Sequence, residues 1–76
     1  MKVMLNSPED ISDFVNACGK LNGVHTSVTY MSRTVDGRSL MGIIALGTGK
    51  ELNVDIITQD ADAEAKLTSM LQKFAV

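Results

Sequence analysis

The sequence has little of what several protein classes require: one cysteine, one proline, one histidine and no excess of positive charge, since the formal net charge is -2. A lone Cys18 excludes an internal disulfide, and its apolar position in a predicted helix favours a buried structural thiol over a reactive one. The negative charge disfavours nucleic acid as a partner. No apolar run approaches the roughly 18 residues that cross a bilayer, and the start lacks a secretory pattern. These absences predict a cytoplasmic protein with no membrane or nucleic-acid partner.

The composition, 45% hydrophobic and 21% charged, is that of an ordinary globular chain. A chain of 76 residues is near the lower limit for one core, because a domain this small buries only about 60% of its unfolded surface. No linker, repeat or low-complexity segment interrupts it. We therefore expect a single domain over residues 1–76.

The first half of the chain predicts strand, helix and strand. Residues 2–5 read as a short strand, after which Ser7 offers a capping hydroxyl and Pro8 stands at the first helical position. Apolar residues then recur at spacings of three and four, as on the buried side of a helix: Ile11, Phe14, Val15, Cys18 and Leu21. Gly19 and Gly23 are expected to supply left-handed positions that end the helix. Over residues 24–30 the period becomes two, which predicts a strand with one wet face.

The second half continues this alternation. Residues 33–35 are expected to form a returning strand, although Met31-Ser32 lacks the chemistry of a tight hairpin. A two-turn helix is predicted from about Ser39, a strand over 52–56, and a last helix capped by Asp60. The order β-α-β-β-α-β-α predicts the α+β class: an open-faced sandwich with three helices on one face of a four-stranded antiparallel sheet.

The central segment carries a specific pattern. Ser32-Arg33 is followed, after four residues, by Arg38–Gly47, which combines a basic residue, a helix-capping serine and an apolar turn with a glycine. With the element order, this segment resembles the serine-site signature of the HPr family, the phosphocarriers of bacterial sugar phosphotransferase systems. Residues 13–18 and 50–54 are similar to that family's first helix and last strand, so the resemblance covers nearly the whole chain. It implies the HPr-like fold.

The resemblance also identifies a missing group. The family has Gly-x-His-x-Arg-Pro between the first strand and the first helix, and its histidine carries phosphate at the helix N-terminus. Here Ser7, Pro8 and Glu9 stand in that place, with no imidazole and no arginine. Glu9 and Asp10 bring about two negative charges to the position where an anion would dock. Phosphate transfer from this loop is therefore not expected.

The one histidine, His25, lies in a Gly-Val-His-Thr-Ser stretch that imitates the carrier motif. It falls inside an alternating strand with no arginine two residues later, rather than at a helix start whose N–H groups would stabilise phosphate. A solvent-facing strand histidine is the favoured interpretation, and a phosphate carrier is the alternative.

Two further roles follow from the resemblance for the segment around Ser39. In some bacteria a kinase phosphorylates the family's corresponding serine, and at a helix N-terminus the dipole and the charge of Arg38 would favour a phosphate on Ser39; simple helix capping is the alternative. The family's surface for binding partner proteins corresponds to Arg38, Leu40, Met41, Gly42 and Leu46. If Leu40 and Met41 merely filled the core, this surface would be lost, so an exposed apolar patch decides the question.

Other chemistry finds no support. Gly47–Lys50 lacks the spacing of a Walker phosphate loop. One histidine and one cysteine on different elements do not make a zinc site, and the acids of residues 60–64 are typical of a helix start rather than of calcium ligands. We expect no metal and no cofactor.

The leading hypothesis is a non-catalytic HPr-like module that binds other proteins through the Ser39–Leu46 helix, with phosphotransferase components, a kinase or a transcription regulator as partners. One alternative is a working phosphocarrier that uses His25 or another residue. A third is a structural or oligomerisation unit in which the first strand is exchanged between two copies, so that both a monomer and a strand-exchanged dimer remain open.

Overall fold

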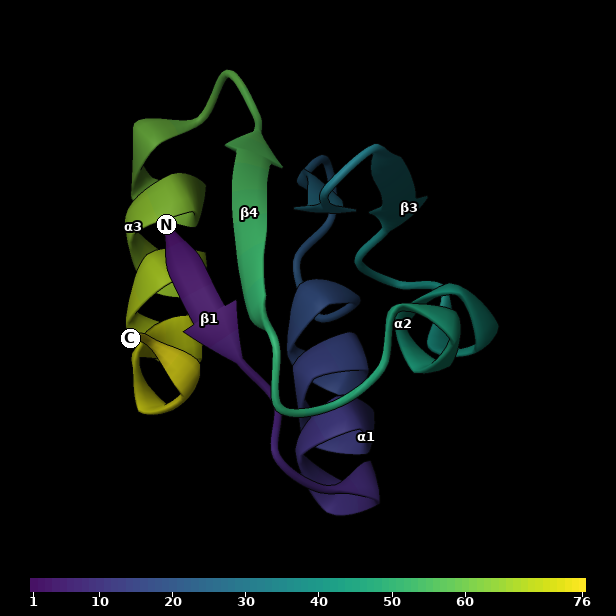
Figure 1. Ribbon diagram of the computed structural model, residues 1–76. Helices are drawn as coiled ribbons and strands as arrows, with labels where there is room; N and C mark the ends of the chain where they lie inside the picture. The colour runs from purple at the N-terminus through teal and green to yellow at the C-terminus, as the bar shows by residue number, and fades with distance from the viewer.

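The computed structural model describes residues 1–76, and every predicted element is present in the predicted order. The elements are β1 (Lys2–Met4), α1 (Pro8–Cys18), β2 (His25–Tyr30), β3 (Arg33–Asp36), α2 (Leu40–Leu46), β4 (Glu51–Ile57), α3 (Ala61–Leu71) and a closing 3₁₀ turn, η1 (Gln72–Phe74) (Figure 1).

The strands form one antiparallel sheet in the order β1-β4-β2-β3. Opposed residues of antiparallel strands share a face, and the register places Val3 opposite Leu52, and Val54 opposite Val28. All four of these side chains are buried, whereas the alternate positions form the open face. The helices cover the buried face only, so the predicted α+β open-faced sandwich is confirmed.

The core joins all three helices to this buried face. Phe14 of α1 and Phe74 of η1 meet edge to face with ring centroids 5.8 Å apart, a favourable aromatic geometry. Fifteen buried apolar residues form one cluster: Val3, Leu5, Ile11, Phe14, Ala17, Cys18, Val24, Val28, Ile43, Leu46, Leu52, Val54, Leu67, Leu71 and Phe74. Because α1 and α2 each bury residues in this cluster, their N-termini are held in fixed positions on the molecule.

Two chain reversals differ from the expectation. Gly23 does adopt a left-handed φ of 76°, but Gly19 has φ -91°, because α1 already ends at Cys18 with the Gly19 N–H donating to carbonyls of the last turn. The β2–β3 connection is a tight two-residue hairpin, since Tyr30 pairs with Arg33. Met31 takes φ 55° there, a left-handed conformation that carries a steric cost for a side chain with a Cβ.

The two edges of the sheet are finished differently. At the β1 edge the C-terminal residues pair with the strand: Val3 bridges Ala75, and the Val76 N–H donates to the Lys2 carbonyl at 3.1 Å. Figure 1 shows the C-terminus beside β1. At the other edge β3 has β2 as its one strand neighbour.

Candidate functional site

The N-terminus of α1 is closed by hydrogen bonds from its own residues. Ser7 Oγ accepts the Asp10 N–H at 3.1 Å, and Asp10 Oδ2 accepts the Asn6 N–H at 3.0 Å. Pro8 has no N–H to offer, and Glu9 beside it is exposed. A hydroxyl and two carboxylates therefore occupy a helix start whose N–H groups and dipole would otherwise attract an anion.

The N-terminus of α2 has the same kind of cap in a different charge environment. Ser39 Oγ accepts the Gly42 N–H at 3.1 Å, in agreement with the predicted capping role. The first turn of α2 holds no acid, and Arg38 immediately precedes the cap. Ser39 is half-buried. A helix start without carboxylates is a favourable electrostatic environment for negative charge.

Arg38 connects the turn before α2 to the sheet. Asp36 Oδ1 accepts the Arg38 N–H at 2.8 Å and lies 3.5 Å from Arg38 Nε. This backbone hydrogen bond, aided by the guanidinium and opposed by partial burial, holds the pKa of Asp36 below its ordinary value. On its other side, Arg38 Nη2 lies 3.4 Å from His25 Nδ1. The Arg38 cation is therefore shared between a carboxylate and an imidazole.

His25 itself is exposed at the start of β2, on the strand face where the alternation placed it. Its one polar side-chain contact is Arg38, and no helix N–H contacts the ring. This contact is not predictable from the sequence, because 13 residues separate His25 and Arg38 and only the path of the β3–α2 turn brings them together. A phosphate-carrying histidine is expected to have both a cation and a helix N-terminus beside it. His25 has the cation, Arg38, but no helix N-terminus among its contacts.

Three side chains of α2 project into solvent: Leu40, Met41 and Ile44 are 46%, 75% and 50% exposed. We call these three residues the α2 patch. Leu40 and Ile44 also line an apolar groove of about 490 Å³, whose other wall includes Pro8 and Ile11 of α1. The fold thus brings the start of α1 and the body of α2 together on one surface.

The exposure of the α2 side chains differs in part from the prediction. Leu40 and Met41 do not fill the core, whereas Leu46, expected in the docking surface, is buried at 2% exposure and supports α2 from beneath. Gly42 is half-buried, and a Cβ there would lie 3.0 Å from Ser39 Oγ, so its role is to let the cap approach. Ile44, which was not predicted as part of this surface, lies on the same face of α2 as Leu40, because residues four apart are neighbours on a helix.

The thiol of Cys18 is buried under the turn before α2, as predicted. Burial raises the pKa of this thiol, and the nearby Thr26 hydroxyl is buried without a hydrogen-bond partner. The Cβ position of Gly37 lies 3.1 Å from Cys18 Sγ, which indicates close packing at this point. The thiol belongs to the core and takes no part in the surface described above.

Comparison with known families decides the classification. The sequence profile described as "PTS HPr component phosphorylation site" matches residues 10–75. The chain belongs to the HPr family. The match begins after Ser7, Pro8 and Glu9, the residues that the sequence analysis predicted to replace the family's histidine motif.

Solved structures of HPr proteins share the fold of this HPr-family chain. HPr-C-His from Thermoanaerobacter tengcongensis superposes with a TM-score of 0.74 at 17% identity, covering 96% of this chain and 90% of that one. Phosphocarrier protein HPr from Bacillus anthracis gives a TM-score of 0.69 at 22% identity, covering 97% and 93%. At this level of identity the likeness establishes the fold alone. No curated protein sequence matches the chain.

The helices of this protein are short. The two longest, α1 and α3, have 11 residues each, and none of the helices has the length and apolarity needed to span a membrane.

Proposed function

We propose that this protein is an HPr-type regulatory module that binds other proteins through the α2 patch and does not itself carry phosphate in the β1–α1 loop. It acts as one domain over residues 1–76, is not an enzyme and needs no cofactor. Its partners are proteins of the phosphotransferase system, a protein kinase or a transcription regulator.

The observation that carries this proposal is the exposure of Leu40, Met41 and Ile44 on a single short helix. A small domain gains stability by burying such side chains, so three of them in solvent beside an apolar groove favour a contact surface. Methionine adds to this, because its flexible thioether adapts to differently shaped partners.

The α1 start supports the other half of the proposal. In a carrier this site must accept a dianionic phosphate, yet here Ser7 Oγ and Asp10 Oδ2 accept the N–H groups of Asp10 and Asn6, and Glu9 adds a second carboxylate. No histidine is present in residues 1–24. A phosphate at this helix start would meet repulsion and no nucleophilic nitrogen.

Ser39 is the residue through which we propose that the α2 patch is regulated. Its hydroxyl adjoins Leu40 and Met41, so a phosphate there would place about two negative charges beside the apolar contact surface. Arg38 is close in sequence, but its guanidinium would have to leave Asp36 or His25 to pair with that phosphate. Because Arg38 is already paired, it would add little to the stability of the phosphorylated form. We therefore expect phosphorylation of Ser39 to change partner binding more than it changes the free energy of unfolding.

The contact surface is tested by comparing Met41→Asp with Met31→Asp. Both methionines are strongly exposed, at 75% and 81%, but only Met41 belongs to the α2 patch. In affinity capture from a lysate of the organism that produces this protein, we expect the wild type and Met31→Asp to retain the same partner and Met41→Asp to lose it. Loss of the partner with both variants, or retention with both, would contradict a contact surface on α2.

A second function, phosphate carriage on His25, is favoured by the Arg38 guanidinium 3.4 Å from its Nδ1. Arginine beside an imidazole would stabilise a phosphoryl group on the ring. In that step a ring nitrogen attacks the phosphorus of a phosphoryl donor, the bond to the donor breaks, and the donor leaves with its electron pair.

Incubation with radiolabelled phosphoenolpyruvate and Enzyme I separates the two functions. We expect no acid-labile label on the wild type. A label that is present in the wild type and absent in His25→Gln would establish the carrier and refute the non-carrier module. A label that survives in His25→Gln would point to a different residue and refute both assignments.

A further inference from the structure

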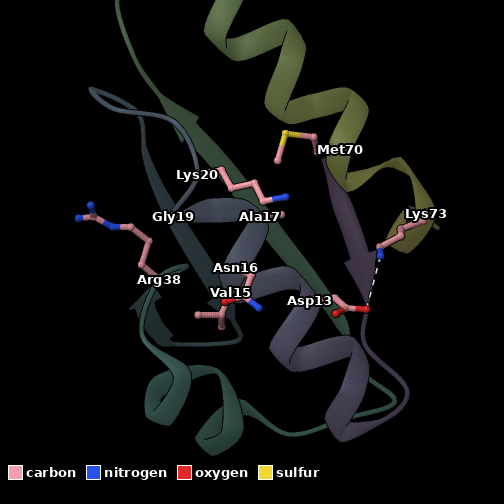
Figure 2. Close-up of a pocket in the computed structure, with 9 residues that line it drawn as sticks. All are labelled: Asp13, Val15, Asn16, Ala17, Gly19, Lys20, Arg38, Met70 and Lys73. Carbon is pink, nitrogen blue, oxygen red and sulfur yellow. Dashed lines mark ion pairs between the residues drawn. The ribbon is translucent and has the colours of Figure 1, made fainter.

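A second groove lies between α1 and α3 and shares no lining residue with the groove beside the α2 patch. Its volume is about 700 Å³. Figure 2 shows Lys20 running across it below Met70, with Lys73 on one side and Arg38 on the other. These four residues come from the end of α1, from α3 and η1, and from the turn before α2, so the fold assembles the groove from three separate regions of the chain.

The charge of this groove is opposite to that of the chain. Lys20, Arg38 and Lys73 are three of the seven basic residues in a protein of net charge -2. One acid, Asp13, lines the groove and forms an ion pair with Lys73 at 3.5 Å. Arg38 is paired with Asp36, which lies outside the groove, and Lys20 has no ion pair.

The position of Lys20 has a partial structural explanation. It follows the C-terminus of α1, where a cation interacts favourably with the helix dipole. Arg38 and Lys73 come from other elements and line the same groove, where Arg38 pairs with Asp36 and Lys73 pairs with Asp13. The lining thus holds three cations and one acid, which leaves the groove with an excess of positive charge and Lys20 without an ion pair.

We propose that the α1–α3 groove binds an acidic, partly apolar segment of a partner protein. The carboxylates of this segment would be attracted by Lys20, Arg38 and Lys73, and its apolar side chains would contact Met70. In such contacts the charges mainly steer association. The inference is independent of the proposed function, because no residue of the α2 patch lines this groove. Binding through exposed charges is weakened by salt, since ions screen charges at such distances.

The test uses the full chain, isotope-labelled for NMR, and a blocked hexapeptide of sequence Glu-Leu-Glu-Glu-Leu-Glu at low ionic strength. We expect saturable shifts in the amide signals of Lys20, Met70 and Lys73. Peptides with Gln or Lys in place of Glu should bind much more weakly or not at all. Added salt should weaken the Glu peptide most.

Two lysine variants distinguish a site from general attraction. Lys20→Glu should weaken the Glu peptide by about fivefold or more, whereas Lys66→Glu should change the affinity by less than about twofold, since exposed charge pairs contribute up to about 1 kcal/mol each. Lys66 is an exposed α3 lysine that does not line the groove, so both variants change the net charge equally. Amide spectra of each variant without peptide check that the fold is retained.

Several results would overturn the proposal. Equal weakening by both variants would indicate attraction to the whole molecule, and shifts confined to Leu40 and Met41 would place the peptide on the α2 patch. No shift with the Glu peptide would leave the groove without its expected ligand. Shifts of the same groove amides on raising the protein concentration alone would show that a second copy of the chain occupies it.

Discussion

The two serine-capped helix starts of this protein have the same backbone chemistry and different surroundings. Ser7 at α1 and Ser39 at α2 each accept an N–H from three residues ahead, both at 3.1 Å. Around Ser7 stand two acids, one of which folds back onto the chain before the helix. The helix turn after Ser39 holds no acid, Arg38 precedes it with Asp36 as its partner, and apolar side chains of α2 are exposed.

The difference shows that a cap alone does not identify a functional helix start. Cap geometry satisfies N–H groups in any helix, so it is equally compatible with a structural and a functional role. What distinguishes α2 is the exposed apolar surface that follows the cap, together with Arg38 before it. The N-termini of α1 and α2 therefore differ in charge and in exposed apolar surface, and not in their capping hydrogen bonds.

The largest expected effect is the difference in stability between a substitution on the buried face of α2 and one on its exposed face. Leu46→Ala should lower the free energy of unfolding by about 3 kcal/mol, because it leaves a cavity in the core, whereas Leu40→Ala should cost less than about 1 kcal/mol. Leu46 is 2% exposed and Leu40 is 46% exposed. Urea unfolding of both variants provides the measurement. Similar losses for the two would mean that α2 packs by a different face.

The turn that leads into α2 should be the next most sensitive point. A Cβ on Gly37 would overlap the Thr26 hydroxyl and lie 3.1 Å from Cys18 Sγ. We expect Gly37→Ala to destabilise the protein by about 2 kcal/mol through overpacking. Gly19→Ala, at the end of α1, is the control, since its nearest atoms lie at 3.6 Å and its φ suits alanine. A thermal melt in which both variants match the wild type would disprove the close packing.

The shared cap predicts equal costs at the two helix starts. Ser7→Ala and Ser39→Ala should each reduce stability by about 1 kcal/mol, because each leaves a helix N–H without its acceptor. The double variant should show the sum, as expected for separate sites. Denaturant titrations of the three variants test this. A much smaller loss at Ser39 would show that its hydroxyl is kept for something other than capping.

The smallest effect concerns the Asp36–Arg38 pair and depends on pH. The folded-state pKa of Asp36 is lowered, so its carboxylate stabilises the fold above the ordinary value of 3.8, and that contribution is lost as the pH falls through the lower folded-state pKa. Because the pair is half exposed, Asp36→Asn should cost less than about 1 kcal/mol at neutral pH. The difference from wild type should shrink in acid. Asp55→Asn, which removes an exposed carboxylate that forms no ion pair, is the matched control.

The arrangement of the elements followed from the sequence because apolar spacing states which face of each element is buried. The alternation over residues 24–30 placed Val28 inside and His25 outside, and both are so placed. The start of α2 at Ser39 was also predictable, since a serine before an apolar run offers a cap. The left-handed Met31 was not, because nothing in its residue type favours that conformation.

The surface of α2 was less predictable for a physical reason. Its seven residues contain no polar side chain, so periodicity does not distinguish the buried Leu46 from the exposed Ile44. The contact of His25 with Arg38 depends on where a turn crosses the end of the sheet. The α1–α3 groove likewise depends on tertiary packing, because its cations are distant in sequence.

The pairing of the C-terminal residues with β1 limits how the sheet can grow. With Ala75 and Val76 occupying that side, further strands can join only beside β3. Two molecules that met edge to edge through β3 would use up the one free row of backbone donors and acceptors that each possesses. Such a pairing would end at two copies, because neither molecule would then have a free sheet edge for open-ended association.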